Sequence, residues 1–147
     1  MPLSARELLA RLIKCEAGGE GDTGMKAVAS VVMNRVNVPY GEYMRVNQGD
    51  LRKVITQPGQ FTCLQETVGG QYNPQNVYNM SPDQIHYDIA DWVIGGGLLN
   101  AVGESLWYFN PYNPECPPYF PANGTGLIDN RILEHCFYTP TQKYAQT

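Results

Sequence analysis

Glu16 is the residue whose place in the sequence best suits acid–base chemistry. It follows Ile13 by three residues and Leu12 by four, so it continues the apolar stripe of a predicted first helix. It also stands at the C-terminal end of that helix, where the helix dipole disfavours negative charge. Burial and the dipole would together raise the pKa of a Glu toward roughly 6–7, which suits a general acid at neutral pH. The alternative is an exposed Glu that points into water, as most acidic side chains do.

Glycoside cleavage usually uses a second carboxylate, and the sequence does not single one out. Glu20 and Asp22 are nearest to Glu16, but the glycines around them leave their direction open; other candidates are Asp88, Asp91 and Glu104. Without a second acid, Glu16 can protonate the leaving oxygen and then, as a carboxylate, help a hydroxyl of the substrate to close a ring. That is lytic transglycosylase chemistry, which needs neither a nucleophile nor an activated water.

The aromatic and amide content is typical of a cleft that binds sugars. The chain has ten Tyr and two Trp, and Asn and Gln are frequent in the predicted loops. Sugars offer apolar ring faces and many hydroxyl groups, which flat aromatic rings and amides can bind together. The alternative is that the large aromatic residues inside helices and strands, Trp92, Trp107 and Phe109, belong to the core.

The composition argues against several other classes of function. A net charge of −4 does not favour a nucleic-acid partner, because such domains usually carry a clustered basic surface. No stretch approaches the roughly 18 apolar residues needed to span a bilayer. With two His and no HExxH or CxxC spacing, we predict no metal site. Neither a G-x-S-x-G motif nor a phosphate-binding loop occurs.

The four cysteines leave their pairing open. Cys116 and Cys136 flank a proline-rich loop and could close it with a disulfide. Cys15 and Cys63 are more typical of packed thiols, and four reduced cysteines are an equal alternative. A nucleophilic Cys15 paired with a histidine can be written down, but its acidic neighbour and its place at a helix C-terminus both raise a thiol pKa, which opposes activation.

The first third of the chain is predicted to be helical. Ser4 and Glu7 form a capping box ahead of a helix that runs to about Glu16. Asp22 and Thr23 can cap a second helix, which is apolar on more than one side and is therefore predicted to be central and buried.

Two further helices are expected in the middle of the chain. Asp50 can cap a short helix over residues 51–56. Residues 60–64 are predicted to be extended. Ser81, followed by a proline and an acid, is the clearest helix start in the chain, and that helix is expected to stop at Gly95.

The last third is aromatic and predicts strands. Residues 106–109 and 136–138 are aromatic runs, and a loop rich in Pro and Asn, residues 110–126, lies between them. The predicted fold class is α+β, with helices followed by a small antiparallel aromatic sheet. The length suits one catalytic domain over residues 1–147.

Five blocks occur in order along the chain and together resemble one known family. They are LIKCEAGGEG (12–21), GMKAVASVVMNRV (24–36), VITQPGQF (54–61), SLWYFNP (105–111) and HCFYTPT (135–141). This set resembles the SleB/CwlJ cell-wall hydrolases, from about Leu8 to Thr141, and the blocks around Cys116 and Cys136 are most similar to the CwlJ branch. Cys15 and Cys63 do not belong to the family pattern.

The resemblance implies a lysozyme-like fold related to lytic transglycosylases and resuscitation-promoting factors, with Glu16 as the catalytic acid. It implies an enzyme that cleaves the glycan strands of spore cortex peptidoglycan during germination. It also implies synthesis in the mother cell without a signal peptide, a location in the coat and cortex region, and a spore-coat partner protein. No cofactor is expected for the chemistry, and the resemblance implies calcium dipicolinate as an activator.

The motif blocks supply five candidates for the wall of a substrate cleft: Gln60, Thr62, Tyr108, Asn110 and Tyr138. Two other functions stay open beside glycan cleavage. One is a coat or peptidoglycan-binding protein that keeps the fold without turnover. The other is a cysteine amidase that acts on the stem peptides.

Overall fold

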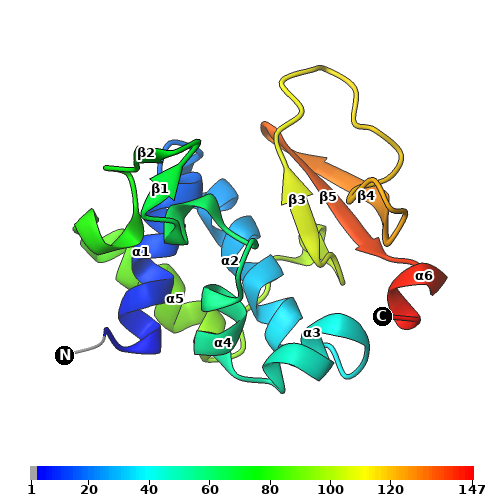
Figure 1. The fold of residues 1–147 in the computed structure, drawn as a ribbon, viewed down its shortest axis with the longest axis horizontal. Helices are drawn as coiled ribbons and strands as arrows, with labels where there is room; N and C mark the ends of the chain where they lie inside the picture. The colour runs from blue at the N-terminus through cyan, green and yellow to red at the C-terminus, as the bar shows by residue number, and fades with distance from the viewer. Residues whose placement is uncertain (1–2) are drawn as a thin grey trace.

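The chain folds as helices first and a three-stranded sheet last (Figure 1). The computed structural model describes residues 3–147. We call α1 to α5, with the segments between them, the helical half, and β3, β4, β5 and α6, with residues 110–125, the sheet half. This architecture confirms the predicted α+β class.

The first helix, α1 (Ala5–Ala17), packs against α2 (Gly21–Asn37) and α5 (Gln84–Ile94). The hydroxyl of Ser4 accepts a hydrogen bond from the Glu7 amide, as the predicted N-cap requires. The predicted stripe is buried and meets apolar residues of the two other helices; the core includes Leu8, Leu9, Leu12, Ile13, Val28, Val32, Ile89 and Val93.

The start of α2 differs from the prediction. The helix begins at Gly21, one residue before Asp22, and neither Asp22 nor Thr23 caps it. Gly21 adopts a positive φ of 74°, which lets the chain turn sharply from α1 into α2. As expected, α2 is largely buried and occupies the centre of the helical half.

Two short helices close the lower end of this half in the view of Figure 1, α3 (Gly41–Asn47) and α4 (Leu51–Thr56). Asp50 caps α4 as predicted, since its carboxylate accepts from the Lys53 amide. The sequence analysis missed α3. Gly41 has a positive φ, and a Cβ there would overlap the ring of Tyr144, so a glycine lets α3 approach α6 (Gln142–Ala145).

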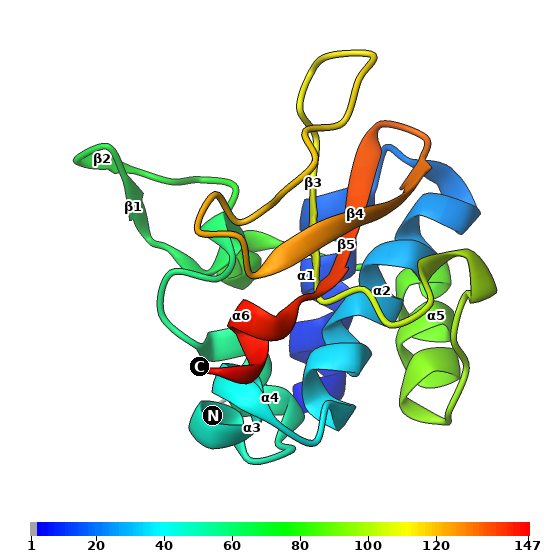
Figure 2. The ribbon, with the colours of Figure 1, turned by 90° about the vertical axis from the view of Figure 1, so that its right-hand side faces the viewer.

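The segment after α4 is less regular than predicted. The expected extended segment over residues 60–64 is wrong, because Thr62–Leu64 form a 3₁₀ turn, η1. A small hairpin, β1 (Thr67–Val68) with β2 (Gln71–Tyr72), and a second 3₁₀ turn, η2 (Val77–Asn79), follow. Figure 2 shows this hairpin projecting from the body of the molecule.

The start of α5 is also a correction. The helix begins at Gln84, and Asp83 is its N-cap in place of Ser81. The Asp83 carboxylate accepts from the backbone of His86, and the His86 ring accepts from the Asp83 amide, so this reciprocal cap overrides the serine. The helix ends at Ile94, before Gly95, as predicted.

The sheet half contains β3 (Trp107–Phe109), β4 (Gly126–Ile132) and β5 (His135–Pro140), in the antiparallel order β3-β5-β4. The 3₁₀ turn η3 (Asn100–Val102) leads into it. Both predicted aromatic strands are confirmed, whereas β4 was not predicted. The sheet covers α2 through a buried cluster that includes Val31 and Phe137 (Figure 2).

Two disulfides join segments that are distant in sequence. Cys116 and Cys136 are bonded, with their Cα atoms 5.9 Å apart. Cys15 and Cys63 are also bonded, with their Cα atoms 6.4 Å apart, so the expectation of packed thiols there is wrong. The turn at η1 brings Cys63 up against the end of α1, which local sequence could not indicate. In the described part of the chain, no helix is long and apolar enough to cross a membrane.

Candidate active site

Glu16 lies where the two halves of the molecule meet. It occupies the last turn of α1 and is partly buried. The hydroxyl of Tyr108, on β3 and 92 residues further along the chain, donates a hydrogen bond of 2.8 Å to Glu16 Oε1. One half thus supplies a carboxyl group and the other half a phenol that holds it.

The surroundings of Glu16 favour its protonated form. Burial raises the pKa of the Glu16 carboxyl above its ordinary value. The hydrogen bond from Tyr108 and the charges of His135 and Arg35 lower that pKa but offset only part of the effect. A carboxyl group with a raised pKa can still carry a proton where an ordinary Glu has lost it.

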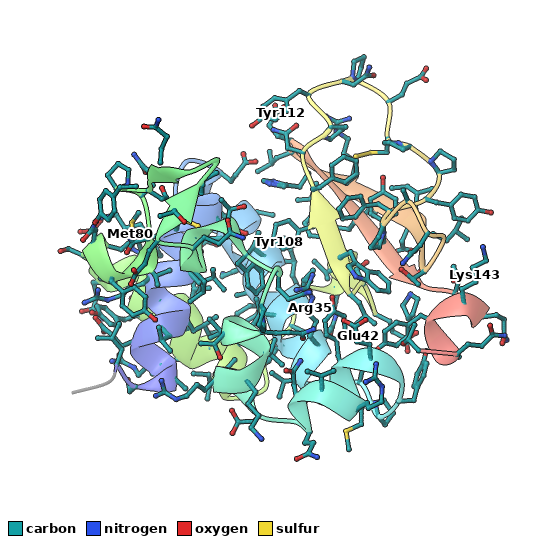
Figure 3. All side chains as sticks on the ribbon, in the orientation of Figure 1. Arg35, Glu42, Met80, Tyr108, Tyr112 and Lys143 are labelled. Carbon is teal, nitrogen blue, oxygen red and sulfur yellow. A yellow bond between two sulfur atoms is a disulfide. The ribbon has the colours of Figure 1, made fainter. Side chains whose placement is uncertain are left out.

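Tyr108 is a hydrogen-bond donor and not an acid in this site. Its burial, followed by the nearby charge of Glu16, raises its pKa well above the ordinary value. The phenol therefore stays protonated and keeps donating to Glu16. Figure 3 shows Tyr108 at the junction of the two halves, with Arg35 of α2 nearby.

A second pair of residues borders the site. His135, the first residue of β5, places its Nδ1 atom 2.9 Å from Glu20 Oε1. The His135 ring also packs edge-on against Tyr108, with ring centroids 5.4 Å apart. The sequence analysis did not include His135 in the site, although it begins the HCFYTPT block. Glu20 is the second-carboxylate candidate that this arrangement connects to Glu16, through His135 and Tyr108.

The other acidic candidates have different roles. Asp22 pairs with Lys26 on α2, and Asp91 pairs with Arg6. Asp88 accepts a hydrogen bond from Gln84 on its own helix, so these three acids contact other parts of the molecule, and Glu104 is exposed.

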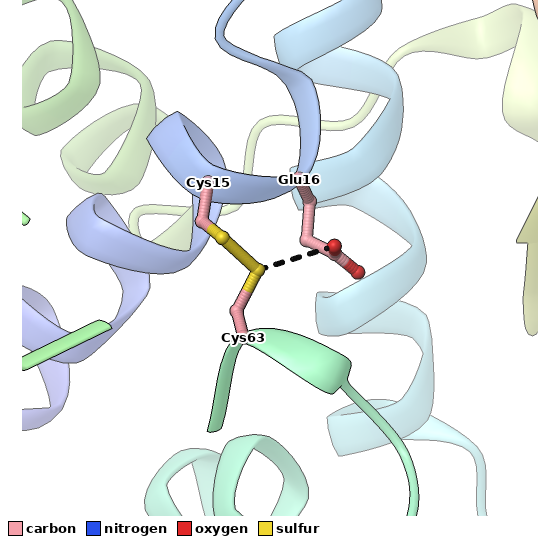
Figure 4. A group of neighbouring side chains, drawn as sticks. All are labelled: Cys15, Glu16 and Cys63. Atoms are coloured by element: carbon pink, nitrogen blue, oxygen red, sulfur yellow. Dashed lines mark hydrogen bonds between the residues drawn. A yellow bond between two sulfur atoms is a disulfide. The ribbon is translucent and has the colours of Figure 1, made fainter. Parts of the chain in front are cut away.

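The disulfide between Cys15 and Cys63 borders Glu16 on its other side (Figure 4). The Sγ atom of Cys63 lies 3.3 Å from Glu16 Oε2. A disulfide sulfur carries no hydrogen, so this is a packing contact and not a donated hydrogen bond. The group Cys15, Glu16 and Cys63 is compact enough to suggest metal ligands, but the sulfurs are bonded to each other and offer no thiolate. All four cysteines are bonded, which leaves no thiol for a cysteine nucleophile.

A cavity of about 300 Å³ lies between the two halves, and Arg35 and Gln60 are part of its wall. Arg35 is 5 % exposed and donates through Nε to the Leu106 carbonyl at 2.7 Å. Its guanidinium lies 4.8 Å from the ring centre of Tyr43 and 5.2 Å from that of Phe61. These contacts fix a positive charge beside the cavity, near enough to Glu16 to lower its pKa.

The sugar-cleft candidates fall in different places. Tyr108 contacts Glu16, and Gln60 lines the cavity, where its Oε1 accepts from the Tyr43 hydroxyl at 2.9 Å. Thr62 is exposed on η1, next to Cys63.

The last two candidates lie elsewhere in the sheet half. Asn110 is partly buried, and its Oδ1 accepts from the Tyr112 amide. Tyr138 is completely buried and donates to the Pro117 carbonyl, so in this conformation it packs inside the sheet half instead of lining a groove.

The family model described as Cell Wall Hydrolase matches residues 19–138 of the chain. The chain belongs to this family. Two cell wall hydrolases named CwlJ, from Halalkalibacterium halodurans and Bacillus subtilis, are 30 % and 33 % identical over 135 residues. Each alignment covers 92 % of the chain and, respectively, 85 % and 84 % of the relative. The match confirms the SleB/CwlJ resemblance.

Two solved structures share the fold of this cell wall hydrolase. The catalytic domain of the germination-specific lytic transglycosylase SleB from Bacillus anthracis superposes with a TM-score of 0.64 at 22 % identity, covering 95 % of the chain and 97 % of that domain. The catalytic domain of SleB from Bacillus cereus gives a TM-score of 0.64 at 24 % identity, with 92 % and 89 % covered. The fold therefore agrees with the lysozyme-like architecture that the motifs implied.

Proposed function

We propose that this cell wall hydrolase cleaves the glycan strands of peptidoglycan, with Glu16 as general acid and then general base. The observation that carries the proposal is the environment of Glu16: a partly buried carboxyl with a raised pKa, held by a neutral phenol at the junction of two halves. A protonated carboxyl can donate its proton to the glycosidic oxygen as the bond breaks.

The proposed product is an anhydro sugar, as formed by a lytic transglycosylase. After donating its proton, the Glu16 carboxylate would take the proton of a hydroxyl on the same sugar, which closes the ring at the anomeric carbon. Tyr108 and Cys63, whose side chains contact the Glu16 carboxyl, offer no carboxylate for a nucleophile or for activating water. Arg35 and His135 support the acid step, because positive charge nearby stabilises the carboxylate that proton donation leaves.

We propose that the cavity beside Arg35 holds a sugar unit next to the bond that is cut. Its volume of about 300 Å³ lies at the lower end of the range for ligand pockets. Its wall combines the aromatic rings of Tyr43 and Trp107 with the amide of Gln60, a mixture that suits sugar faces and hydroxyl groups. Gln60→Ala should therefore raise KM more than it lowers kcat.

The relatives support a particular source of the peptidoglycan. Because the relatives include CwlJ hydrolases and a germination-specific SleB, we propose that the substrate is spore cortex peptidoglycan and the site of action is the spore coat and cortex region. The coat partner protein and activation by calcium dipicolinate stay predictions from the family resemblance.

Mass spectrometry of fragments released from purified cortex sacculi tests the function. Anhydro ends in the products support a transglycosylase, and reducing ends would show hydrolysis instead. If the wild-type protein releases no fragments but binds tightly to sacculi, it is a non-catalytic peptidoglycan-binding protein. Cleaved stem peptides would overturn glycan cleavage altogether. Glu16→Gln is the matched control for each product.

A further inference from the structure

The Cys15–Cys63 disulfide contacts Glu16, the residue on which the proposed function depends. Cys15 is the direct neighbour of Glu16 on α1, and Cys63 reaches the same carboxyl group from η1 (Figure 4). The Cys63 sulfur lies 3.3 Å from Oε2, and the Tyr108 hydroxyl lies 2.8 Å from Oε1. The carboxyl group is therefore held between one sulfur and one phenol.

The backbone on both sides of this contact is a helix end or a short 3₁₀ turn. Glu16 is the second-to-last residue of α1, and Gly18 and Gly19 follow the helix end. Helix ends fray, and glycines make the following turn more mobile. On the other side, η1 has three residues and leads directly into the exposed β1–β2 hairpin. The disulfide is the covalent link between these two segments.

We propose that the Cys15–Cys63 disulfide is a positioning element of the catalytic site, which fixes the Oε2 side of the Glu16 carboxyl and keeps water away from it, while Tyr108 holds Oε1. This inference rests on the proposed role of Glu16 as the acid. Cys15 and Cys63 act through Glu16 and make no contact with the substrate.

Reduction of the disulfide would change the chemistry as well as the geometry. A dithiol reductant supplies two electrons and two protons, the S–S bond breaks into two thiols, and the reductant becomes a cyclic disulfide. The new S–H of Cys63 could then donate to Glu16 Oε2, which the oxidised sulfur cannot do. A donated hydrogen bond and freer access of water both stabilise the carboxylate, so the pKa of Glu16 falls.

The other groups that face Glu16 come from elements that the Cys15–Cys63 disulfide does not join, so we expect them to stay in place when it is lost. These are Tyr108 from β3, Arg35 from α2, and His135 from β5 with its partner Glu20. All three neighbours of Glu16 favour its carboxylate, and burial opposes them. Loss of the Cys15–Cys63 disulfide exposes the carboxyl to water and weakens the effect of burial. The pH above which activity is lost should therefore move downward.

The test compares two double variants that each lack one disulfide. Cys15→Ala/Cys63→Ala removes the sulfur cover, and Cys116→Ala/Cys136→Ala removes the bridge inside the sheet half. For the first variant we expect a fall in kcat of about 10- to 100-fold with little change in KM, because a misplaced acid costs roughly this much. We also expect the basic limb of its pH–rate profile to lie at lower pH. For the second variant, the basic limb should stay where it is in the wild type.

Circular dichroism checks that each variant is folded, and activity is assayed at temperatures well below each midpoint of thermal unfolding. If the first variant does not fold, the second variant, which keeps only Cys15–Cys63, is assayed with and without dithiothreitol, and its fold is checked in the same way. An unchanged basic limb and kcat after loss of Cys15–Cys63 overturn the inference, and so do equal changes in the two variants. Full activity of Glu16→Gln would instead overturn the proposed function, so the two failures are distinguishable.

Discussion

The helical half and the sheet half are stabilised in different ways. The helical half buries aliphatic side chains in a repeating pattern along α1, α2 and α5. The core of the sheet half is largely aromatic, with Phe109 stacked on Phe120 at 4.2 Å between ring centres, and a loop that is closed by the Cys116–Cys136 bridge. The acid comes from the half with regular secondary structure, and its phenol comes from the half with long loops. Catalysis in our proposal therefore requires both halves to be correctly docked.

The largest expected effect is the loss of catalytic rate in Glu16→Gln, a variant in which both halves stay folded. Glu16→Gln keeps the side chain's shape and still accepts a hydrogen bond from Tyr108, but it cannot donate the catalytic proton. The rate of release of fragments from cortex sacculi should fall by at least about 10²–10⁴-fold. Full activity of the folded variant would contradict the proposed acid.

The same variant has a pH-dependent effect on stability. Because the folded-state pKa of Glu16 is raised, the native protein binds this proton more tightly than the unfolded chain does. Stability is therefore lost as the pH rises through the raised pKa. Glu16→Gln removes this loss, so its free energy of unfolding relative to the wild type should be higher at pH 8 than at pH 4. Urea denaturation at the two pH values measures it.

The next largest effect is on stability, and it compares the disulfide of the helical half with that of the sheet half. Chain entropy predicts that loss of the Cys15–Cys63 bridge, which spans 48 residues, costs about 4 kcal/mol of unfolding free energy. Loss of Cys116–Cys136, which spans 20 residues, should cost about 3 kcal/mol. Urea denaturation of the two double alanine variants checks both values. A much larger loss for the sheet-half bridge would mean that the sheet half depends on its disulfide more than the helical half does.

Tyr108→Phe breaks the contact between the two halves at the acid while leaving the aromatic packing in place. Loss of one hydrogen bond to a charged or partly charged group costs about 1.5–3 kcal/mol, so kcat should fall by roughly 10- to 100-fold. The hydrogen bond lowers the pKa of Glu16, so its removal should move the basic limb of the pH–rate profile to higher pH. A shift to lower pH would contradict the assigned role of the phenol.

The smallest expected effect is confined to the helical half. Asp50→Ala removes the N-cap of α4, which lies outside the proposed site, and should cost about 1 kcal/mol of stability. Thermal unfolding measures the loss, and the pH–rate profile should not move. A shifted profile would mean that the ends of the helical half are coupled to Glu16 more tightly than we infer.

Local sequence signals indicated much of the helical half and the acid itself. The stripe of Leu12 and Ile13 predicted both the buried face of α1 and the inward direction of Glu16, because helical geometry places residues three and four apart on the same face. Two helix starts were misplaced, since Ser81 and Asp22 suit caps locally but a neighbouring residue forms the actual boundary.

Only the tertiary structure decided what surrounds the acid. Tyr108 and His135 reach the site from strands that are far from α1 in the sequence, and no local pattern predicts their contact with its end. The same holds for Cys63, whose bond to Cys15 depends on a 3₁₀ turn where an extended segment was predicted. Helix periodicity is a local property that a sequence displays directly, whereas a pKa and a disulfide depend on which distant segments the fold brings together.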